Sequence, residues 1–503
     1  MLSINDSIFC DIMPRMTNVD YKPTIGLEIH AELKTETKMF CNSKNNADEK
    51  TPNTNICPVC MAHPGTLPVI NKEAVRQVLR VGTALKGNLA DFTEFDRKNY
   101  FYPDIPKGYQ ISQYKYPLVS GGVLNGIEVT RVHLEEDTAR SSHDKGDYTL
   151  LDFNRAGVPL MELVTEPVVK DSKEAGNFAR ELQLLLRTLG ASDANMEKGE
   201  MRVEANVSVM KRSVLEEERS DGKGPTLGTK VEVKNINSFK AVESAIEYEI
   251  ARQIKELEAG GEVVQETRGW DENKGKTFRQ RSKEDAHDYR YFPDPDLPKL
   301  RISKISDFAK DVIAESMPEL PWKKRATLKD KYGLKDEDIE MFVRMPVFGD
   351  FLEKVLENLG GDKKKIQLAS NYITSDLVGL MKDNLEARLP SDFIKPNYFA
   401  ELINMVEAGE VSSRGAKDIL KAMFGKDENP REIAKEKSLF QESNEEELGK
   451  IIEAVLKEHS GVAEEYKSGK DSALQFLVGQ VMRITKGSAN PQIAKKIIEE
   501  KLA

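Results

Sequence analysis

The segment Ile25 to Leu33, IGLEIHAEL, alternates between two kinds of position without a break. One set of positions holds only apolar side chains, whereas the other holds Gly26, Glu28, His30 and Glu32. Successive side chains of a β-strand point to opposite faces, so the segment predicts a strand with one face on a core. Its other face presents two carboxylates and an imidazole.

Similar alternating segments recur up to about residue 295, among them MRVEANVSV and KVEVKN. They are separated by helical stretches such as residues 238–259, for which Ser238 is the expected N-cap and Gly260 and Gly261 the stop. Strands and helices do not follow each other at a constant spacing. The pattern therefore predicts an α+β domain on an antiparallel sheet rather than a doubly wound parallel one.

A chain of 503 residues is too long for one ordinary core, since domains hold about 100–200 residues. The strand signal ends at YFPDPDLPKL, and from about residue 306 the chain is helical and charged. We expect an N-terminal extension (1–21), a sheet domain (22–295), a helical domain (296–425) and a helical tail (426–503).

The charge and hydropathy of the chain restrict its partners and its location. A net charge of −10 argues against nonspecific coating of nucleic acid, although it leaves room for a local basic site. No apolar run is long enough to span a bilayer, and the N-terminus has no basic region before its short apolar stretch. We expect a cytoplasmic protein without a membrane partner.

Two further segments carry acids in strand-like surroundings. RVHLEED contains Glu135 and Glu136, and GVPLMELVTEP holds Glu162 inside an apolar run. A buried carboxylate is costly unless it is paired or bound to a metal. Carboxylates from separate strands together with one imidazole would suit Mg²⁺, which prefers oxygen ligands and commonly bridges to substrate phosphates.

A structural interpretation of the same acids stays open. Glu28 and Glu162 would then be ion-paired to arginines such as Arg155 or Arg202. The strand pattern alone does not separate the two interpretations.

The cysteines suggest a second site. Cys57 and Cys60 form a CxxC knuckle, Cys41 lies sixteen residues upstream of Cys57, and His63 is the nearest candidate for a fourth ligand. In a reducing compartment such a cluster indicates metal rather than cross-linking, and a structural zinc ion takes four ligands. The alternative is three reduced thiols without metal. Nothing places a base beside a nucleophilic cysteine.

Two aromatic, proline-rich loops, FDRKNYFYPDIPKGYQISQY and DYRYFPDPDLP, have the composition of a base-stacking surface. Rigid loops that pack aromatic rings over a sheet edge would have the same composition, and we favour that interpretation. The chain has no GxxxxGK[ST] loop and no GxGxxG after a strand, so any nucleotide must be held in another way.

The last basic stretch, residues 472–498, contains no acidic residue. It predicts one helix closed by Gly487 and another that begins at Asn490 and Pro491. A basic C-terminal segment in an acidic protein suggests a contact with phosphate groups. The default interpretation is that these side chains form an ordinary solvent-exposed surface. Its basic residues are Arg483, Lys486, Lys495 and Lys496.

Eight ordered blocks from about Lys22 to the C-terminus resemble the B-subunit family of bacterial aspartyl/glutamyl-tRNA amidotransferases. They include IGLEIHAEL, PNTNICPVC, HLEEDTARSSH, DFNRAGVPLMELVTEP, DYRYFPDPDLP and FLVGQVMRITKGSANP. The resemblance implies a carbon–nitrogen ligase that uses glutamine as amide donor and converts Glu-tRNA(Gln) or Asp-tRNA(Asn) to the amidated form. This component of the complex would use ATP to phosphorylate the side-chain carboxylate. A separate amidase subunit (A) would supply ammonia through a tunnel, and a small subunit (C) would join the two.

The resemblance also implies site residues, on a cradle-shaped domain similar to that of glutamine synthetase. Glu28, His30, Glu136 and Glu162 match the positions that hold Mg²⁺ and line the kinase site, although the pattern does not separate Glu135 from Glu136. A second set of expected cofactor-binding residues lies on neighbouring strand faces: Arg202, Glu204, Asn206 and Glu232.

The resemblance has one departure. Zinc-bearing members usually have Cys-x-Cys before the CxxC, whereas Ser43 stands at the second of these positions here. Either His63 or another group completes a zinc site, or the cluster binds zinc weakly or has lost zinc binding. The tail resembles a tRNA-contacting module, which makes its four basic residues candidates for tRNA binding. Two other functions stay open: a noncatalytic tRNA-binding scaffold and a stand-alone ligase for a small carboxylic acid.

Overall fold

The computed structural model describes residues 20–142, 146–212, 227–282, 288–382, 389–441, 445–485 and 489–502. Contacts divide the chain into two compact units at Leu320 and Pro321. The predicted N-terminal extension lies almost wholly outside the described residues. The predicted boundaries at residues 295 and 425 stay predictions.

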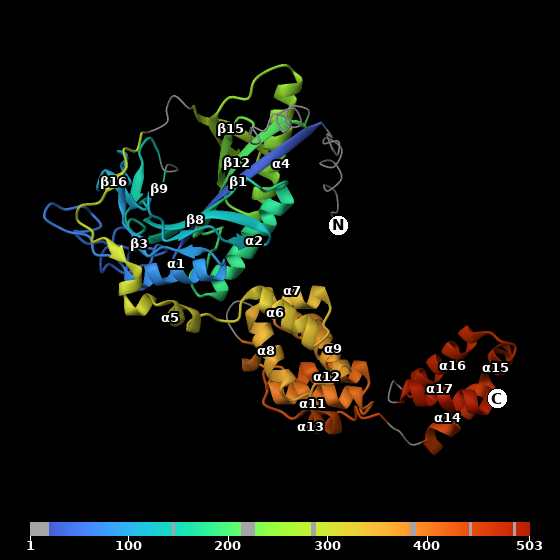
Figure 1. Ribbon diagram of the computed structural model, residues 1–503. Helices are drawn as coiled ribbons and strands as arrows, with labels where there is room; N and C mark the ends of the chain where they lie inside the picture. Colours follow the sequence, from blue (N-terminus) through green and yellow to red (C-terminus); the bar gives the residue numbers. More distant parts are fainter. Residues whose placement is uncertain are drawn as a thin grey trace. The chain divides into compact units, whose positions relative to one another are not determined.

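The first unit is built on one large sheet (Figure 1). Its strands run in the order β15-β14-β13-β12-β1-β11-β8-β6-β2, and β7 pairs with β8. Neighbouring strands are antiparallel except β13 and β14, so the predicted α+β fold on a mainly antiparallel sheet is confirmed. The strands are β1 (Tyr21–Glu32), β2 (Asn88–Leu89), β6 (Val119–Ser120), β7 (Val123–Leu124), β8 (Ile127–Glu136), β11 (Pro159–Thr165), β12 (Met201–Lys211), β13 (Val231–Ile236), β14 (Glu266–Asp271) and β15 (Lys276–Ser282).

One face of this sheet is covered by helices α1 (Lys72–Ala84), α2 (Ser172–Thr188) and α4 (Phe239–Glu258) (Figure 1). In β1, Ile25, Leu27 and Ile29 are fully buried. Burying apolar surface is the main favourable contribution to folding. Because side chains of β1 alternate between faces, all of its large apolar side chains point to the face that the helices cover. The polar side chains of β1 are consequently left on the opposite face.

Local sequence signals set the helix ends. Asn71, Asp171 and Ser238 precede α1, α2 and α4, and each side chain accepts a hydrogen bond from a backbone N–H of the first turn. The predicted N-cap at Ser238 is confirmed. Helix α4 ends at Glu258, just before the two glycines.

Short strands outside the large sheet bring the two aromatic loops together. Strand β4 (Asp96–Asn99) pairs with both β5 (Tyr109–Ser112) and β16 (Phe292–Pro293), while β17 (Leu300–Arg301) pairs with β3 (Phe92–Thr93) and β9 (Arg140–Ser142) with β10 (Leu150–Asp152). The rings of Tyr114 and Tyr291 are stacked with centroids 4.3 Å apart. The loops therefore pack on each other, as we expected from their composition.

Gly82 tests the packing of α1 on the sheet. A Cβ at this position would lie 2.5 Å from a methyl group of Val119 and 2.7 Å from one of Leu89. We expect Gly82→Ala to lower the free energy of unfolding of this unit by about 1–3 kcal/mol, the usual cost of overpacking. Gly176→Ala in α2 is the control, because the three atoms nearest to its added methyl all belong to the Glu243 side chain, which is partly exposed and can shift. Equal urea midpoints for the two variants would contradict this account.

The first unit ends with η2 (Ile302–Lys304), η3 (Ser306–Phe308) and α5 (Lys310–Glu315). Every element described in the second unit is a helix. Among the described residues, no helix has the length and apolarity needed to cross a membrane. The helices are α6 (Pro321–Ala326), η4 (Thr327–Lys331), α7 (Asp336–Arg344), α8 (Pro346–Leu356), α9 (Lys363–Asn371), η5 (Tyr372–Leu377), α10 (Val378–Leu380), η6 (Pro390–Asp392), α11 (Pro396–Glu407), α12 (Ser413–Met423), α13 (Pro430–Glu436), α14 (Glu445–Glu458), α15 (Ser460–Lys467), α16 (Asp471–Ile484) and α17 (Pro491–Leu502).

The last four helices share a hydrophobic core that includes Ile452, Leu477, Val481 and Ile498. Asn490 caps α17 by accepting a hydrogen bond from the backbone N–H of Gln492, which confirms the predicted start of that helix. The predicted end of the preceding helix at Gly487 lies outside the described residues.

Candidate functional site

The open face of the large sheet gathers polar side chains from five neighbouring strands. On β1, His30 lies opposite Glu162 of β11, which in turn lies opposite His133 of β8. On the other side of β1, Glu28 lies opposite Glu204 of β12. The register thus places residues from distant parts of the sequence on one surface, which we call the polar face. Its potential metal ligands form two groups: His30, Glu135 and Glu162, and Glu28, Glu204 and Glu232.

The first group centres on Glu162. Its Oε2 lies 3.4 Å from Nε2 of His30 and 3.3 Å from Nε2 of His133, and Oε1 of Glu135 lies 3.6 Å from Nε2 of His30. The side chain of Glu162 is almost fully buried, which would be costly for an isolated carboxylate. The two imidazoles therefore provide the partners that this buried acid needs.

Charge interactions in the first group outweigh burial. Burial alone would lower the pKa of His30, but its hydrogen bond with Glu162 and the charges of Glu162 and Glu135 raise that pKa to about 9. Burial likewise opposes ionisation of Glu162, but His133 and His30 hold its pKa well below the usual value. Without a metal, Glu162 is a carboxylate stabilised by protonated imidazole.

The second group is made of carboxylates only. Glu28 accepts a hydrogen bond of 2.7 Å from the amide nitrogen of Asn206, and Nζ of Lys234 lies 2.9 Å from Glu204 and 3.4 Å from Glu232. Burial raises the pKa of Glu28, and the charge of Glu162 raises it further, against the lowering effect of the Asn206 bond. The protein thus holds Glu28 in a strongly negative environment.

Both groups bring three potential ligand atoms into one small region. In each, one ligand atom per residue lies within 4.8 Å of the others. Mg²⁺ binds oxygen at about 2.0–2.1 Å in an octahedron, so two of its ligands lie up to about 4.2 Å apart. The all-oxygen group of Glu28, Glu204 and Glu232 has the donors that Mg²⁺ prefers, while His30 gives the other group a nitrogen donor.

The structure corrects the choice of Glu136 over Glu135. Glu136 lies on the other side of β8, where it contacts Nζ of Lys107 at 2.6 Å and accepts a hydrogen bond from the backbone N–H of Ile111. Adjacent residues of a strand point to opposite faces, so only one of the two glutamates can face His30. That residue is Glu135.

The arginines weighed as partners for Glu28 and Glu162 lie elsewhere. Arg202, from the expected cofactor-binding set, lies 2.6 Å from Asp137, and Nε of Arg155 lies 3.7 Å from the same carboxylate. Arg131 instead is the arginine near Glu162, at 3.7 Å. Arg155 and Arg202 are therefore not the partners, but the structural alternative holds for Glu162 in that an arginine, Arg131, does lie beside it.

His133 and Lys234 were not predicted from the sequence, and Lys98 was expected only as a basic residue of the first aromatic loop. His133 lies two residues before Glu135 in RVHLEED, so the strand alternation could have placed both side chains on the same face. Lys98 lies in an aromatic loop, and despite its burial the charges of Glu135 and of nearby tyrosines raise its pKa. Only the packing of that loop near the sheet reveals this electrostatic effect of Glu135 on Lys98.

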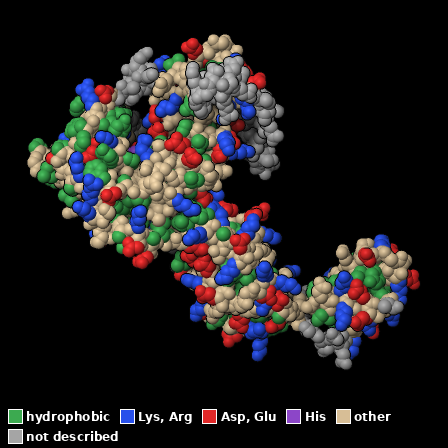
Figure 2. All heavy atoms as spheres, in the orientation of Figure 1, with side chains coloured by type: hydrophobic (Ala, Val, Ile, Leu, Met, Phe, Trp, Pro, Cys, Tyr) green, Lys and Arg blue, Asp and Glu red, His purple; other side chains and the backbone are tan. Residues whose placement is uncertain are grey.

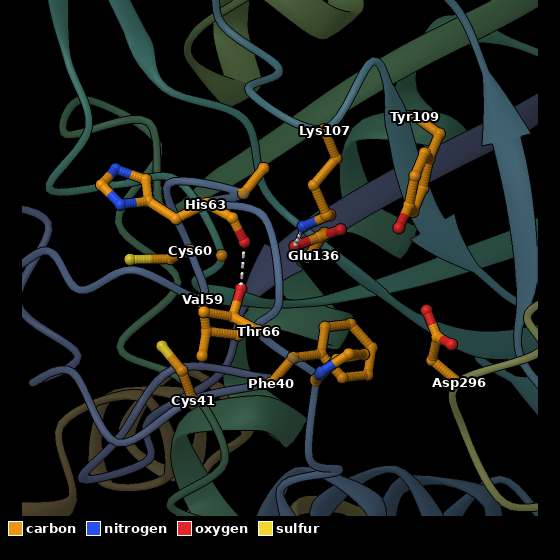
Figure 3. Close-up of a pocket in the computed structure, with 13 residues that line it drawn as sticks. Phe40, Cys41, Val59, Cys60, His63, Thr66, Lys107, Tyr109, Glu136 and Asp296 are labelled. Atoms are coloured by element: carbon orange, nitrogen blue, oxygen red, sulfur yellow. Dashed lines mark hydrogen bonds and ion pairs between the residues drawn. The ribbon is translucent and has the colours of Figure 1, made fainter.

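On the other side of Glu136 lies a cavity of about 240 Å³ (Figure 3). Lys107, Tyr109 and Glu136 line one part of it, and Cys41 and Cys60 line another. The sulfur atoms of Cys41, Cys57 and Cys60 lie within 4.8 Å of one another. Sequence reasoning thus grouped the three cysteines correctly.

The donor set at the cysteines does not complete a four-ligand zinc site. The Sγ atoms of Cys57 and Cys60 are 3.9 Å apart, close to the separation of about 3.8 Å expected for two thiolates on one zinc ion. His63 is exposed and is not part of the cluster. The hydroxyl of Ser43 lies 3.8 Å from the sulfur of Cys60.

Hydrogen bonding distributes charge unequally among these thiols. The hydrogen bond from Cys41, helped by the Lys38 ammonium and the backbone N–H of Cys57, lowers the pKa of Cys60 to about 4. The same bond to Cys60, followed by burial, raises the pKa of Cys41. The surroundings therefore favour the thiolate form of Cys60 over that of Cys41.

The basic residues of the tail are at its surface. Arg483, Lys495 and Lys496 are exposed, and the two lysines lie 3.9 Å and 3.8 Å from Glu499 and Glu500. On the side of the molecule shown in Figure 2, basic and acidic side chains are interspersed over these helices. Lys486 lies outside the described residues.

Comparison with known proteins identifies the family. A model of the GatB/GatE catalytic domain matches residues 23–306, and a model of the GatB domain matches residues 350–502. The GatB protein of the aspartyl/glutamyl-tRNA(Asn/Gln) amidotransferase from Thermoanaerobacter pseudethanolicus is 43% identical over 491 residues, which cover 96% of this chain and 99% of that protein. This chain belongs to the GatB family of amidotransferase components.

Two further relatives support the same family assignment. The corresponding GatB protein of Persephonella marina is 42% identical over 493 residues, and that of Synechocystis is 40% identical over 504 residues. Each alignment covers 96% of this chain and at least 98% of the relative. The family's catalytic-domain match contains every residue of the polar face named above.

Proposed function

We propose that this chain uses ATP to phosphorylate the side-chain carboxylate of Glu-tRNA(Gln), Asp-tRNA(Asn) or both, and then transfers ammonia to it. A carboxylate is a poor acyl donor because oxide would have to leave. Transfer of the γ-phosphoryl group of ATP to the carboxylate gives an acyl phosphate, from which ammonia displaces phosphate. A partner amidase subunit would release the ammonia from glutamine, and a small third subunit would join the complex.

The observation that carries this proposal is the pair of ligand groups on the polar face. Phosphoryl transfer depends mainly on positioning and on stabilising negative charge, and Mg²⁺ supplies that charge stabilisation when bound. Glu28, Glu204 and Glu232 are the residues that would hold it, because they offer only oxygen. His30, Glu135 and Glu162 form a second set of ligand atoms beside them.

The remaining residues of the polar face position these ligands. Asn206 fixes one oxygen of Glu28, and Lys234 holds Glu204 and Glu232. His133 orients Glu162 from the far side of β11. Groups that orient metal ligands commonly affect metal affinity or activity by about 10–100-fold.

Ammonium chloride offers a direct test of the proposed division of labour. The complex, purified with an inactivated amidase subunit, should still amidate Glu-tRNA(Gln) or Asp-tRNA(Asn) when ammonium chloride replaces glutamine and ATP is present. Omitting ATP should abolish the product. Amidation that proceeds without ATP would contradict phosphorylation as the activating step.

The tail supports a tRNA substrate through its exposed basic residues. We expect the double variant Lys495→Ala, Lys496→Ala to weaken tRNA binding by the complex and to reduce the slope of log K against log salt by about 0.7–0.9 per lost phosphate contact. Filter binding at several salt concentrations measures both quantities. Glu499→Gln, Glu500→Gln is the matched control and should strengthen binding, since it frees the same lysines. An unchanged salt slope in the lysine variant would show that these tail lysines do not contact the tRNA.

A further inference from the structure

Cys60 lies among several polar groups. It is 6% exposed, and its sulfur accepts a hydrogen bond of 3.1 Å from the backbone N–H of Cys57. The sulfur of Cys57 lies 3.9 Å away and the hydroxyl of Ser43 3.8 Å away. The thiol of Cys60 in turn donates to the Cys57 sulfur and to the backbone oxygen of Cys57, 3.4 Å away, so the two sulfurs of the CxxC turn face each other.

A buried ammonium group completes the surroundings of Cys60. Lys38 is fully buried, its Nζ lies 4.0 Å from the Cys60 sulfur, and it donates a hydrogen bond of 3.1 Å to the backbone oxygen of Phe153. A buried charge needs an opposite charge or strong hydrogen bonds. Burial lowers the pKa of Lys38, against the raising effect of the cysteines, so Lys38 stands beside Cys60 as a hydrogen-bond donor.

The donor count also argues against a structural zinc ion. Structural sites almost always have four Cys, His or carboxylate ligands, and here three thiols are joined by a hydroxyl and an ammonium group. Nothing else among the described residues joins this cluster as a metal ligand. Two thiols held close together without a metal have the arrangement of a redox-active pair.

We propose that Cys57 and Cys60 form a reversible disulfide in this chain, with a low-molecular-weight disulfide as the oxidant, and that they do not hold a structural zinc ion. Cys57 is partly exposed and can reach the oxidant, whereas Cys60 is buried beside it. Cys41 is the third thiol of the cluster and stays reduced.

The reaction is a thiol–disulfide exchange in two steps. The Cys57 thiolate attacks one sulfur of the oxidant, forming a mixed disulfide and releasing one small thiolate. The Cys60 thiolate then attacks the Cys57 sulfur, and the second small thiolate leaves. The two cysteine protons end on the two released thiols, and two electrons pass from the cysteine pair to the oxidant.

The test uses the full-length chain and its Ser43→Cys variant, which restores a fourth sulfur beside Cys60. Both are measured for zinc content, treated with oxidised glutathione and mapped by alkylation and mass spectrometry. We expect the wild type to carry well under one zinc ion per chain and to form the Cys57–Cys60 disulfide, which dithiothreitol reverses. The variant should bind about one zinc ion per chain and resist oxidation.

Two further variants locate the bond. Cys41→Ser should leave disulfide formation intact, whereas Cys57→Ser should abolish it. A wild type that holds about one chelator-resistant zinc ion per chain, or whose Cys57 and Cys60 stay reduced in oxidised glutathione, would overturn the proposal. A Ser43→Cys variant without zinc that oxidises like the wild type would show that the missing fourth thiol is not what decides between the two states.

Discussion

Replacing Glu28 with glutamine should lower Mg²⁺-dependent ATP turnover by the complex by at least about 10²-fold, the loss typical of removing one preorganised electrostatic contact at a reacting group. Glu28 shares a ligand group with Glu204 and Glu232, and the substitution removes one of its three negative charges. The amide oxygen of glutamine can still accept the hydrogen bond from Asn206, so the fold should persist. Phosphate release with misacylated tRNA measures the loss, and a melting curve checks the fold.

Glu128→Gln is the matched control for Glu28→Gln. Glu128 is on strand β8 of the same sheet, but it is exposed and belongs to neither ligand group. Its replacement should leave turnover close to that of the wild type. Turnover by Glu28→Gln equal to that of this control would show that the polar face is not the kinase site, and it would favour the noncatalytic scaffold.

Replacing Asp137 with alanine should lower the free energy of unfolding by about 1–3 kcal/mol or more, because it leaves the partly buried side chains of Arg202 and Arg155 without the carboxylate that they share. Asp137 is 4% exposed, and Arg202 and Arg155 hold its pKa at about 2 although burial opposes this. It also accepts a hydrogen bond from the backbone N–H of Thr138. Urea unfolding of the full chain measures the change.

The exposed pair of Lys34 and Asp193 is the control for Asp137. Its atoms are 2.9 Å apart, but both side chains are more than 60% exposed. Water and salt screen such a pair, so Asp193→Ala should change the free energy of unfolding by less than about 1 kcal/mol. If both alanine variants have the same urea midpoint, the Asp137 pair contributes no more than a surface contact.

The sequence allowed the polar face to be predicted in part. The period-two pattern of β1 placed Glu28 and His30 on the face away from the core, and the same rule applied to Glu204 and Asn206 of β12. The same rule puts Glu135 on the parity of His133, but applying it to Glu136 required the end of strand β8, which the sequence places only to within a residue or two. The division into two ligand groups also depends on pairing between strands that are far apart in the chain.

The cysteine cluster shows a different limit of sequence reasoning. The CxxC spacing placed Cys57 beside Cys60, because a tight turn joins them. The approach of Lys38 and Ser43 to Cys60 depends on how the preceding loop folds back, and the exposure of His63 depends on the following turn. Spacing alone therefore suggested a fourth ligand that the fold does not deliver.

The most direct test of the central claim is the dependence of ATP hydrolysis on tRNA. The wild-type complex would be assayed with Glu-tRNA(Gln), with Asp-tRNA(Asn), with uncharged tRNA and without tRNA. We predict phosphate release only with one or both misacylated tRNAs, because the substrate carboxylate is the phosphoryl acceptor. Equal hydrolysis in all four assays would contradict the account and would favour a ligase that acts on a small free acid.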